Sequence, residues 1–269
     1  MRIIRTGGRI TNINVILYFI VVEYPICLST HTRTHTHTHT HLIYTMNHRS
    51  IVYMWNFKPH ERSSIPMECI RKNTMFMPEY SIVTPHDIIP ILSSFDGLPE
   101  LWAKIPEKYW IVKADLGRLL YIYKHGGFYL DVDCVMVSNP FNTINPKCDR
   151  MLLFTEFTVS VDKLGPRECK HPRNGLRIAN FAFASNFKRH PFLELCIREC
   201  IRRLTYLFDL NLEKWEETDI LWVCGPDVIT TMYHAQFSDD GSDADVDSSI
   251  RLIQRGHLQH LGYGSWRDE

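Results

Sequence analysis

Two aspartates, Asp131 and Asp133, stand one residue apart after the short apolar run Phe128–Leu130. Alternate residues of an extended strand share a side, so the spacing predicts that both carboxylates point the same way, with Val132 turned into the core. Like charges this close repel, and a divalent cation removes that conflict because hard cations take carboxylate oxygens. Strand ends in α/β sheets are also where ligands bind. By itself, the pair fits a solvated strand end as well.

A helix is predicted directly before this run. Apolar residues recur at steps of three and four between Val112 and Tyr123, which gives the helix one apolar stripe. Lys124 and His125 suit the negative carboxyl end of a helix, and the Gly126–Gly127 pair can end it in a left-handed conformation.

Asp115 and Arg118 lie on this predicted helix. They are three residues apart and therefore share a face. Without further context they would form a surface ion pair, which contributes little to stability.

Short strands and helices alternate upstream of these residues. Strands are predicted at 50–55 and 79–83, with a short helix at 65–73 between them. Thr84 opens a further helix, which Pro90 interrupts early. This βαβ alternation predicts an α/β domain with a mostly parallel central sheet flanked by helices.

The first 45 residues differ from the rest. The Thr-His repeat at 30–41 has no means of building a core. The apolar run at 13–22 is short for a membrane span, which needs about 20 residues. Arginines at its amino-terminal side suit a signal peptide or a weak anchor. We expect residues 1–45 to be a disordered tail or a weak signal-anchor and residues 46–269 to form the folded domain.

The composition is that of a globular protein. Hydrophobic residues make up 45% and charged residues 22%, and the formal net charge is zero. This balance argues against nucleic acid as a partner.

The eight cysteines form no Cys-x-x-Cys pair, so zinc-ribbon and thioredoxin-like sites lack support. Cys196 and Cys200 are expected on one helix as core thiols. The acidic stretch 239–247 lacks the ligand order of a calcium loop and is expected to be a solvated loop.

The residues around the two aspartates resemble a known family. Lys-x-Asp-x-x-Arg is followed, eight residues after its arginine, by Gly-Gly-x-Tyr-Leu-Asp-x-Asp. This string resembles the glycosyltransferase sugar-binding-region family that contains a DXD motif. That family includes initiation-specific α-1,6-mannosyltransferases, inositol phosphoceramide mannosyltransferases and capsular polysaccharide transferases. Here the string consists of Lys113, Asp115, Arg118, Gly126, Gly127, Tyr129, Leu130, Asp131 and Asp133.

Shorter matches follow in the family's order, so the resemblance extends from about Trp55 to Trp266. The family's usual opening before its first strand ends is absent here, apart from the strand and Trp55. The later matches are Asn180, His190 with Pro191 and Phe192, Gly225 with Pro226, and the ending His260, Gly264, Ser265 and Trp266.

The resemblance implies a GT-A-type fold and retaining transfer of a hexose from a nucleotide-sugar, GDP-mannose or a UDP-hexose. The acceptor would be a glycan, a lipid or a protein. A Mn²⁺ or Mg²⁺ cofactor would be held by Asp131, Asp133, His260 and Ser265. The donor would contact Trp55, Asp115, Arg118, Asp131, Asn180 and Trp266. Of these, Asp115, Arg118 and Asp131 would be catalytic.

The residue types suit this chemistry independently of the resemblance. Transfer from a nucleotide-sugar needs a cation to neutralise the departing diphosphate. It also needs groups that stabilise the sugar as it becomes oxocarbenium-like. Location depends on the amino terminus. A genuine anchor would place the protein on Golgi or other secretory-pathway membranes, and without one it would be cytoplasmic.

Two alternatives stay open. A protein of the same fold could bind a nucleotide-sugar without turning it over, and donor consumption distinguishes the two. A haloacid-dehalogenase-like phosphatase also uses an apolar strand ending in Asp-x-Asp, with the first aspartate as nucleophile. That second alternative leaves Asp115, Arg118 and the paired glycines unexplained.

Overall fold

The structure is a computed structural model that describes residues 50–59, 64–145, 148–158, 176–236 and 249–262. The predicted tail, residues 1–45, lies outside these ranges, as do the acidic stretch 239–247 and the two site candidates Ser265 and Trp266. Among the described residues, none of the helices combines the length and the hydropathy that a membrane crossing requires.

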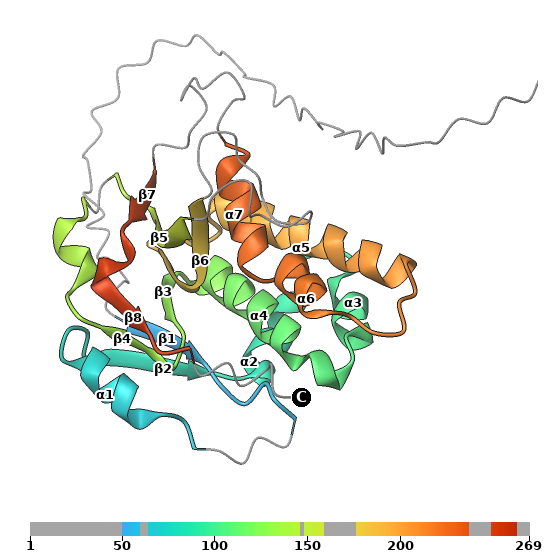
Figure 1. The fold of residues 1–269 in the computed structure, drawn as a ribbon, viewed down its shortest axis with the longest axis horizontal. Helices are drawn as coiled ribbons and strands as arrows, with labels where there is room; N and C mark the ends of the chain where they lie inside the picture. The colour runs from blue at the N-terminus through green and yellow to red at the C-terminus, as the bar shows by residue number, and fades with distance from the viewer. Residues whose placement is uncertain (1–49, 60–63, 146–147, 159–175, 237–248, 263–269) are drawn as a thin grey trace, which may run out of the picture. The chain divides into compact units, whose positions relative to one another are not determined.

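Strands and helices alternate along the first half of the described chain (Figure 1). The strands are β1 (Ser50–Met54), β2 (Glu79–Val83), β3 (Gly127–Leu130), β4 (Cys134–Met136), β5 (Met151–Thr158), β6 (Leu176–Ser185), β7 (Ile250–Ile253) and β8 (Leu258–His260). The α-helices are α1 (Met67–Thr74), α2 (Pro85–Leu92), α3 (Leu98–Lys104), α4 (Trp110–His125), α5 (Pro191–Asp209), α6 (Glu217–Val223) and α7 (Pro226–His234).

Six of the strands form one mixed sheet in the order β2-β1-β3-β6-β5-β7. The β1–β2, β1–β3 and β5–β7 pairings are parallel, whereas β6 runs antiparallel to both β3 and β5. The predicted α/β class, with a central sheet flanked by helices, is therefore confirmed. The antiparallel strand β6 follows the site residues along the chain, in a stretch where the sequence showed no strand–helix alternation. A separate two-stranded antiparallel sheet pairs β4 with β8.

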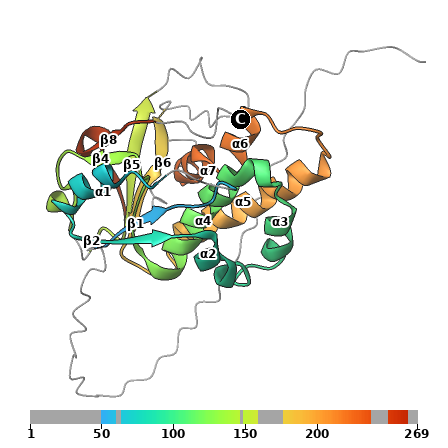
Figure 2. The same cartoon turned by 90° about the horizontal axis from the view of Figure 1, so that it is seen from below.

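The main sheet separates two hydrophobic cores. Val52 and Met54 on β1 pack toward the larger core, and Ile51 and Tyr53 pack toward the smaller one. Because both faces are covered, the central strands read as continuous apolar runs rather than alternating ones. Figure 2 shows the layers, with α2 to α7 on one side of the sheet and α1, β4 and β8 on the other.

Helix α4 is the longest element that leads into the candidate site. It ends at His125, as its apolar pattern and following glycines predict. Gly126 adopts φ +74°, and a Cβ there would lie 3.0 Å from the carbonyl oxygen of Ser185. A left-handed residue this close to a neighbouring strand favours glycine. The glycine turn therefore lets the chain leave α4 and enter β3 beside β6.

The other predicted local features have clear outcomes. The capping box at Thr84 and Asp87 opens α2, and Pro90 lies within that helix, which ends two residues later. Cys196 and Cys200 are buried on α5 as free thiols, as predicted.

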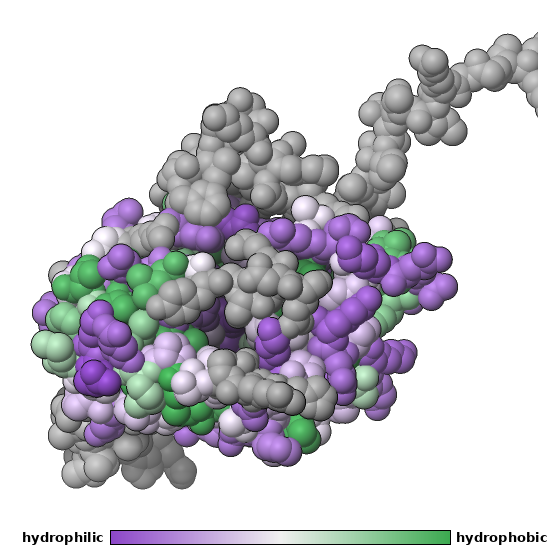
Figure 3. All heavy atoms as spheres, turned by 60° about the horizontal axis from the view of Figure 1, so that its bottom comes forward, coloured by the Kyte–Doolittle hydropathy of each residue, from purple (hydrophilic) through white to green (hydrophobic). Residues whose placement is uncertain are grey.

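Figure 3 shows one face of the molecule as mainly hydrophilic, with hydrophobic residues in separate small groups.

Candidate active site

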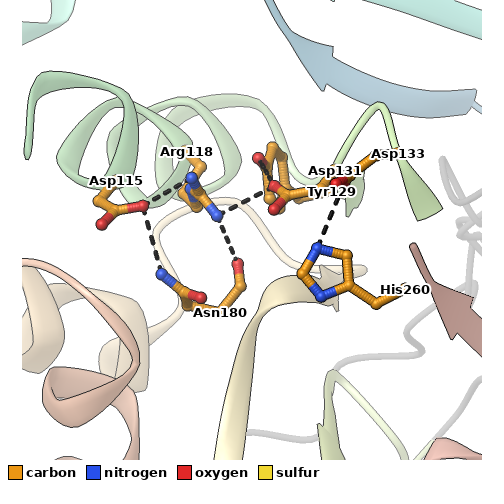
Figure 4. Close-up of polar contacts among 7 residues, drawn as sticks. All are labelled: Asp115, Arg118, Tyr129, Asp131, Asp133, Asn180 and His260. Atoms are coloured by element: carbon orange, nitrogen blue, oxygen red, sulfur yellow. Dashed lines mark hydrogen bonds and ion pairs between the residues drawn. The ribbon is translucent and has the colours of Figure 1, made fainter. Parts of the chain in front are cut away.

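Arg118 lies at the centre of a buried polar network on the face of α4 that meets β3 and β6 (Figure 4). One of its terminal nitrogens, Nη2, lies 2.6 Å from Oδ1 of Asp115. The other, Nη1, lies 3.0 Å from Oδ1 of Asp131 and donates to the carbonyl oxygen of Asn180 at 2.9 Å. The side-chain amide of Asn180 donates to Asp115 at 3.2 Å. The guanidinium thus joins two carboxylates from different parts of the chain.

Asp131 faces this arginine because it continues the alternation of β3 by one residue. Its backbone N–H donates to the carbonyl oxygen of Phe181 at 2.8 Å, which extends the pairing of β3 with β6. The hydroxyl of Tyr129, two residues earlier and on the same side, donates to Oδ1 of Asp131. The guanidinium of Arg118 also stacks over the ring of Tyr129, 4.7 Å from its centroid. Asp131 is therefore fixed toward α4.

The two carboxylates beside Arg118 are costly to ionise. Burial raises the pKa of Asp115 to about 7, although the charge of Arg118 opposes the rise. Burial likewise raises the pKa of Asp131 against the same positive charge. The side chains are 6% and 24% exposed, and the guanidinium between them favours their charged forms against the effect of burial.

Asp133 has a different partner from Asp131. The chain turns after β3, with the N–H of Cys134 donating to the carbonyl oxygen of Asp131 at 3.0 Å. In this turn Oδ1 of Asp133 lies 3.3 Å from Nε2 of His260 on β8. The expectation that the two aspartates point the same way assumed a continuous strand. The turn gives one carboxylate to Arg118 and the other to His260 (Figure 4).

His260 is held in place from two sides. Its ring stacks on Phe181 of β6 at 4.5 Å between centroids. The N–H of Leu261 donates to the carbonyl oxygen of Asp133 at 3.0 Å, which ties β8 to the turn. Burial alone would lower the pKa of His260, but the hydrogen bond to Asp133 and the charges of Asp131, Asp133 and Glu156 raise it overall.

The side chains of Asp133, Cys134 and His260 could hold a metal ion. Their ligand atoms all lie within 4.8 Å of one another. Burial raises the pKa of the Cys134 thiol well above its usual range, which disfavours the thiolate in the absence of a metal. Carboxylate oxygens bind Mg²⁺ and Mn²⁺, and imidazole binds many divalent transition metals. A divalent cation is therefore compatible with this donor set.

A cavity of about 790 Å³ connects the two halves of the site. This volume lies within the range of about 300–1,000 Å³ that is typical of ligand pockets. Asp115, Arg118, Asp131, Asp133 and His260 all line it. The apolar part of its lining includes Trp55, Phe57, Trp110, Ile111, Ile220 and Leu221, and Glu156 and Arg177 add further polar groups.

The structure brings together most of the predicted site residues. Asp115, Arg118, Asp131 and Asn180 form one network, Asp133 meets His260, and Trp55 is on the cavity wall. Their roles toward donor and metal stay predictions, as do those of Ser265 and Trp266.

Two contributions were not anticipated from the sequence. Tyr129 belongs to the motif string, and its position two residues before Asp131 could have revealed the hydrogen bond. Asn73 on α1 donates to the carbonyl oxygen of Cys134 and accepts from the N–H of Met136. This buried amide fixes the segment that follows Asp133, and no sequence signal pointed to it.

The fold and site together describe an α/β domain with a polar, carboxylate-rich ligand cavity. Residues 63–150 match the family model described as "Glycosyltransferase sugar-binding region containing DXD motif". The matched range includes Asp115, Arg118 and the Asp131-Val132-Asp133 string. The resemblance predicted from the sequence is thus confirmed over about a third of the chain, and the enzyme class that it gives is glycosyltransferase.

Solved structures give more distant likenesses. The chain is similar to a structure titled "PaToxG Glycosyltransferase", with 16% identity over 70% of this chain and 69% of that one, at a TM-score of 0.45. It is also similar to the galactosyltransferase LgtC in complex with donor and acceptor sugar analogs, with 10% identity over 78% and 86% of the two chains and a TM-score of 0.37. Both likenesses are remote, and the classification rests on the family match. No curated protein matches the chain in sequence.

Proposed function

We propose that this protein is a metal-dependent retaining glycosyltransferase that moves a hexose from a nucleotide-sugar to a hydroxyl group of an acceptor. The observation that carries the proposal is the pairing within one cavity of a buried arginine–carboxylate network with an aspartate–histidine pair. The first suits the sugar of the donor, and the second suits a cation on its diphosphate.

The network around Arg118 is proposed to hold the donor sugar. Asp115 and Asp131 offer carboxylate oxygens that accept from sugar hydroxyls, and Asn180 offers an amide that is already oriented by its bond to Asp115. The carboxylates also lie where they can stabilise positive charge on a sugar that becomes oxocarbenium-like. Because Arg118 fixes both of them beforehand, little reorganisation is needed at the moment of reaction.

Asp133 and His260 are proposed to hold Mn²⁺ or Mg²⁺, with Asp131 and Ser265 as further ligands implied by the family. A divalent cation bound there supplies positive charge against the diphosphate that leaves the sugar. The stacking of His260 on Phe181 keeps its imidazole aimed at Asp133. We assign no side chain as a covalent nucleophile.

The base of the nucleotide is proposed to lie at the end of β1. Trp55 and Phe57 line the cavity there, next to Lys58. Aromatic faces stack on any base, so this arrangement suits a nucleotide without distinguishing guanine from uracil. The donor would then be GDP-mannose or a UDP-hexose, and the acceptor a glycan, a lipid or a protein.

A hydrolysis screen tests this function. The full chain is incubated with Mn²⁺ and a panel of GDP- and UDP-sugars, and released nucleoside diphosphate is measured. We expect one donor to be consumed and EDTA to abolish its consumption. A donor that binds with Mn²⁺ but is never consumed would instead support a binding protein of the same fold. Release of phosphate from simple phosphate esters with no nucleotide-sugar turnover would support the phosphatase alternative.

A further inference from the structure

The cavity has a third polar wall, which the proposed donor contacts leave unused. Glu156 near the end of β5 and Arg177 at the start of β6 both line it. Nε of Arg177 lies 3.2 Å from Oε2 of Glu156, and Nη2 of the same guanidinium lies 3.1 Å from Oδ1 of Asp227. These contacts hold a carboxylate and a guanidinium side by side on the cavity surface.

Helix α7 supports this wall from behind, and the two side chains that line the cavity are partly exposed. Asp227 belongs to the first turn of α7 and is only 6% exposed, so it anchors the arginine from behind. The hydroxyl of Thr230 accepts from the N–H of Ile178 at 3.0 Å, which fastens α7 to β6 beside the pair. Arg177 is 13% exposed and Glu156 is 24% exposed, so the carboxylate is the more accessible partner. Both side chains line the cavity, so a ligand there can contact either of them.

The position of the wall separates it from the groups proposed to bind the donor. The donor sugar is assigned to Asp115 and Arg118 on α4, Asp131 after β3 and Asn180 on β6, and the base to the end of β1. Glu156 lies on β5 and lines the same cavity as Asp133 and His260, the residues proposed to hold the cation. The bond between sugar and diphosphate would break within this cavity, and an incoming hydroxyl would need to reach it there.

The charge of the wall indicates what it can bind. Asp227 balances the charge of Arg177 from behind and does not line the cavity, so Glu156 is the carboxylate that this wall presents to a ligand. Such a surface disfavours a phosphate or a carboxylate on an incoming ligand. Neutral hydroxyls fit it, because a carboxylate accepts from them and a neighbouring guanidinium donates to them.

We propose that Glu156 and Arg177 form the acceptor subsite and select a neutral polyhydroxylated acceptor, a sugar or a polyol, over a phosphorylated one. The inference rests on the proposed function and names its acceptor class. Glu156 accepts a hydrogen bond from a hydroxyl of the acceptor, and Arg177 keeps that carboxylate in place through its second contact with Asp227.

The test compares two acceptor probes in the presence of the donor that the wild type consumes. Methyl α-mannopyranoside is the neutral probe and mannose 6-phosphate is the anionic one, and kcat/KM is measured for each. In the wild type, the neutral probe is expected to be preferred. Glu156→Gln should raise the KM for the neutral probe by at least about tenfold, as the loss of a hydrogen bond to a charged group predicts. Glu156→Gln should also lower the ratio of kcat/KM for the neutral probe to kcat/KM for the anionic probe.

Two further variants distinguish binding from structure. Glu156→Asp keeps the charge but shortens the reach, so it should retain the neutral preference while raising KM. Glu68→Gln is the control and should behave as wild type. Glu68 is an exposed glutamate on α1 that forms an ion pair with Lys72. The donor dissociation constant of Glu156→Gln should change much less than the acceptor KM, which separates an acceptor role from a donor role.

Several results would overturn the acceptor subsite while leaving the proposed function intact. In Glu156→Gln, these results are an unchanged acceptor KM, an unchanged preference between the two probes, or a donor affinity that falls as much as the acceptor KM rises. In the wild type, they are a preference for the phosphorylated probe or no use of either probe. A wild type that consumes no nucleotide-sugar would contradict the proposed function itself.

Discussion

At the scale of single residues, Arg118 links sequence to chemistry. Its spacing from Asp115 is that of an ordinary helical ion pair, which on a surface would be worth little. The structure buries both side chains to about 5% exposure and adds Asp131 as a second carboxylate. Removing part of such a pair leaves an uncompensated buried charge, which is strongly destabilising. Stability and site geometry therefore depend on the same guanidinium.

Replacing Arg118 by lysine tests this dependence. Lysine keeps the charge but cannot contact Asp115, Asp131 and the carbonyl oxygen of Asn180 at once. We expect the free energy of unfolding to fall by about 2–4 kcal/mol, measured by chemical denaturation. Arg198→Lys is the matched control, since Arg198 pairs with a glutamate while 65% exposed, and it should change stability by less than about 0.5 kcal/mol. Equal effects of the two substitutions would contradict a central role for Arg118.

Individual residues also show which parts of the site the sequence could predict and which it could not. The motif string correctly grouped Asp115, Arg118 and Asp131, because its spacing is long and specific. The direction of Asp133 depended on where β3 ends, and strand ends are poorly determined by local pattern. One residue of turn was enough to give Asp133 a partner on β8, far along the chain.

At the scale of elements, helix α4 was the most predictable part and β6 the least. An apolar stripe and terminal glycines specify a helix locally, whereas β6 depends on pairing with β3 and β5 across long stretches of chain. The packing of α5 against α6 is equally non-local. Arg203 of α5 is 3% exposed and donates to the carbonyl oxygen of Trp222 at 2.6 Å. Its charge is balanced by Glu199, 2.7 Å away on the same helix.

Glu199→Gln tests this helix contact. Without the carboxylate, the buried guanidinium loses its counter-charge, so we expect the free energy of unfolding at pH 7 to fall by about 1–3 kcal/mol. Glu213→Gln, an exposed glutamate beyond the end of α5, is the control and should have little effect. The free energies are measured by denaturant titration, and a loss no larger than that of the control would show that Glu199 is dispensable.

The same variant has a predicted pH dependence. Burial alone would raise the pKa of Glu199, but hydrogen bonds from Arg202 and Arg203 lower it below its ordinary value near 4.5. A carboxylate whose pKa is lower in the folded state stabilises the protein above its unfolded pKa, and this contribution is lost as pH falls through the folded value. The stability difference between wild type and Glu199→Gln should therefore shrink below about pH 4. A difference that grows on acidification would contradict the assignment.

At the scale of the whole molecule, the cavity is assembled from segments more than 200 residues apart. Trp55 follows β1, the aspartates follow β3, and His260 belongs to β8. The family resemblance indicated that these segments meet, but neither periodicity nor composition could have shown it. The third wall, from Glu156 and Arg177, was missed because a lone glutamate and arginine on two strands carry no motif.

Asp131 and Asp133 contact different partners, and this difference predicts how the whole site responds to ligands. Asp131 is occupied by Arg118 and Tyr129, so Asp133 with His260 is the part of the site that should respond most to a cation. Donor binding and cation binding should then be coupled, since the cation offsets the charge that the diphosphate brings into a carboxylate-rich cavity.

Calorimetric titration of GDP and UDP into the protein tests this central claim most directly. With Mn²⁺ present, we expect one nucleotide to bind the wild type at least about tenfold more tightly than it does in EDTA. Asp133→Asn should remove that difference, while Asp96→Asn, an exposed aspartate between α2 and α3, should retain it. Equal Mn²⁺-dependent affinity in the wild type and Asp133→Asn would contradict the assignment of this site to a metal-dependent glycosyltransferase.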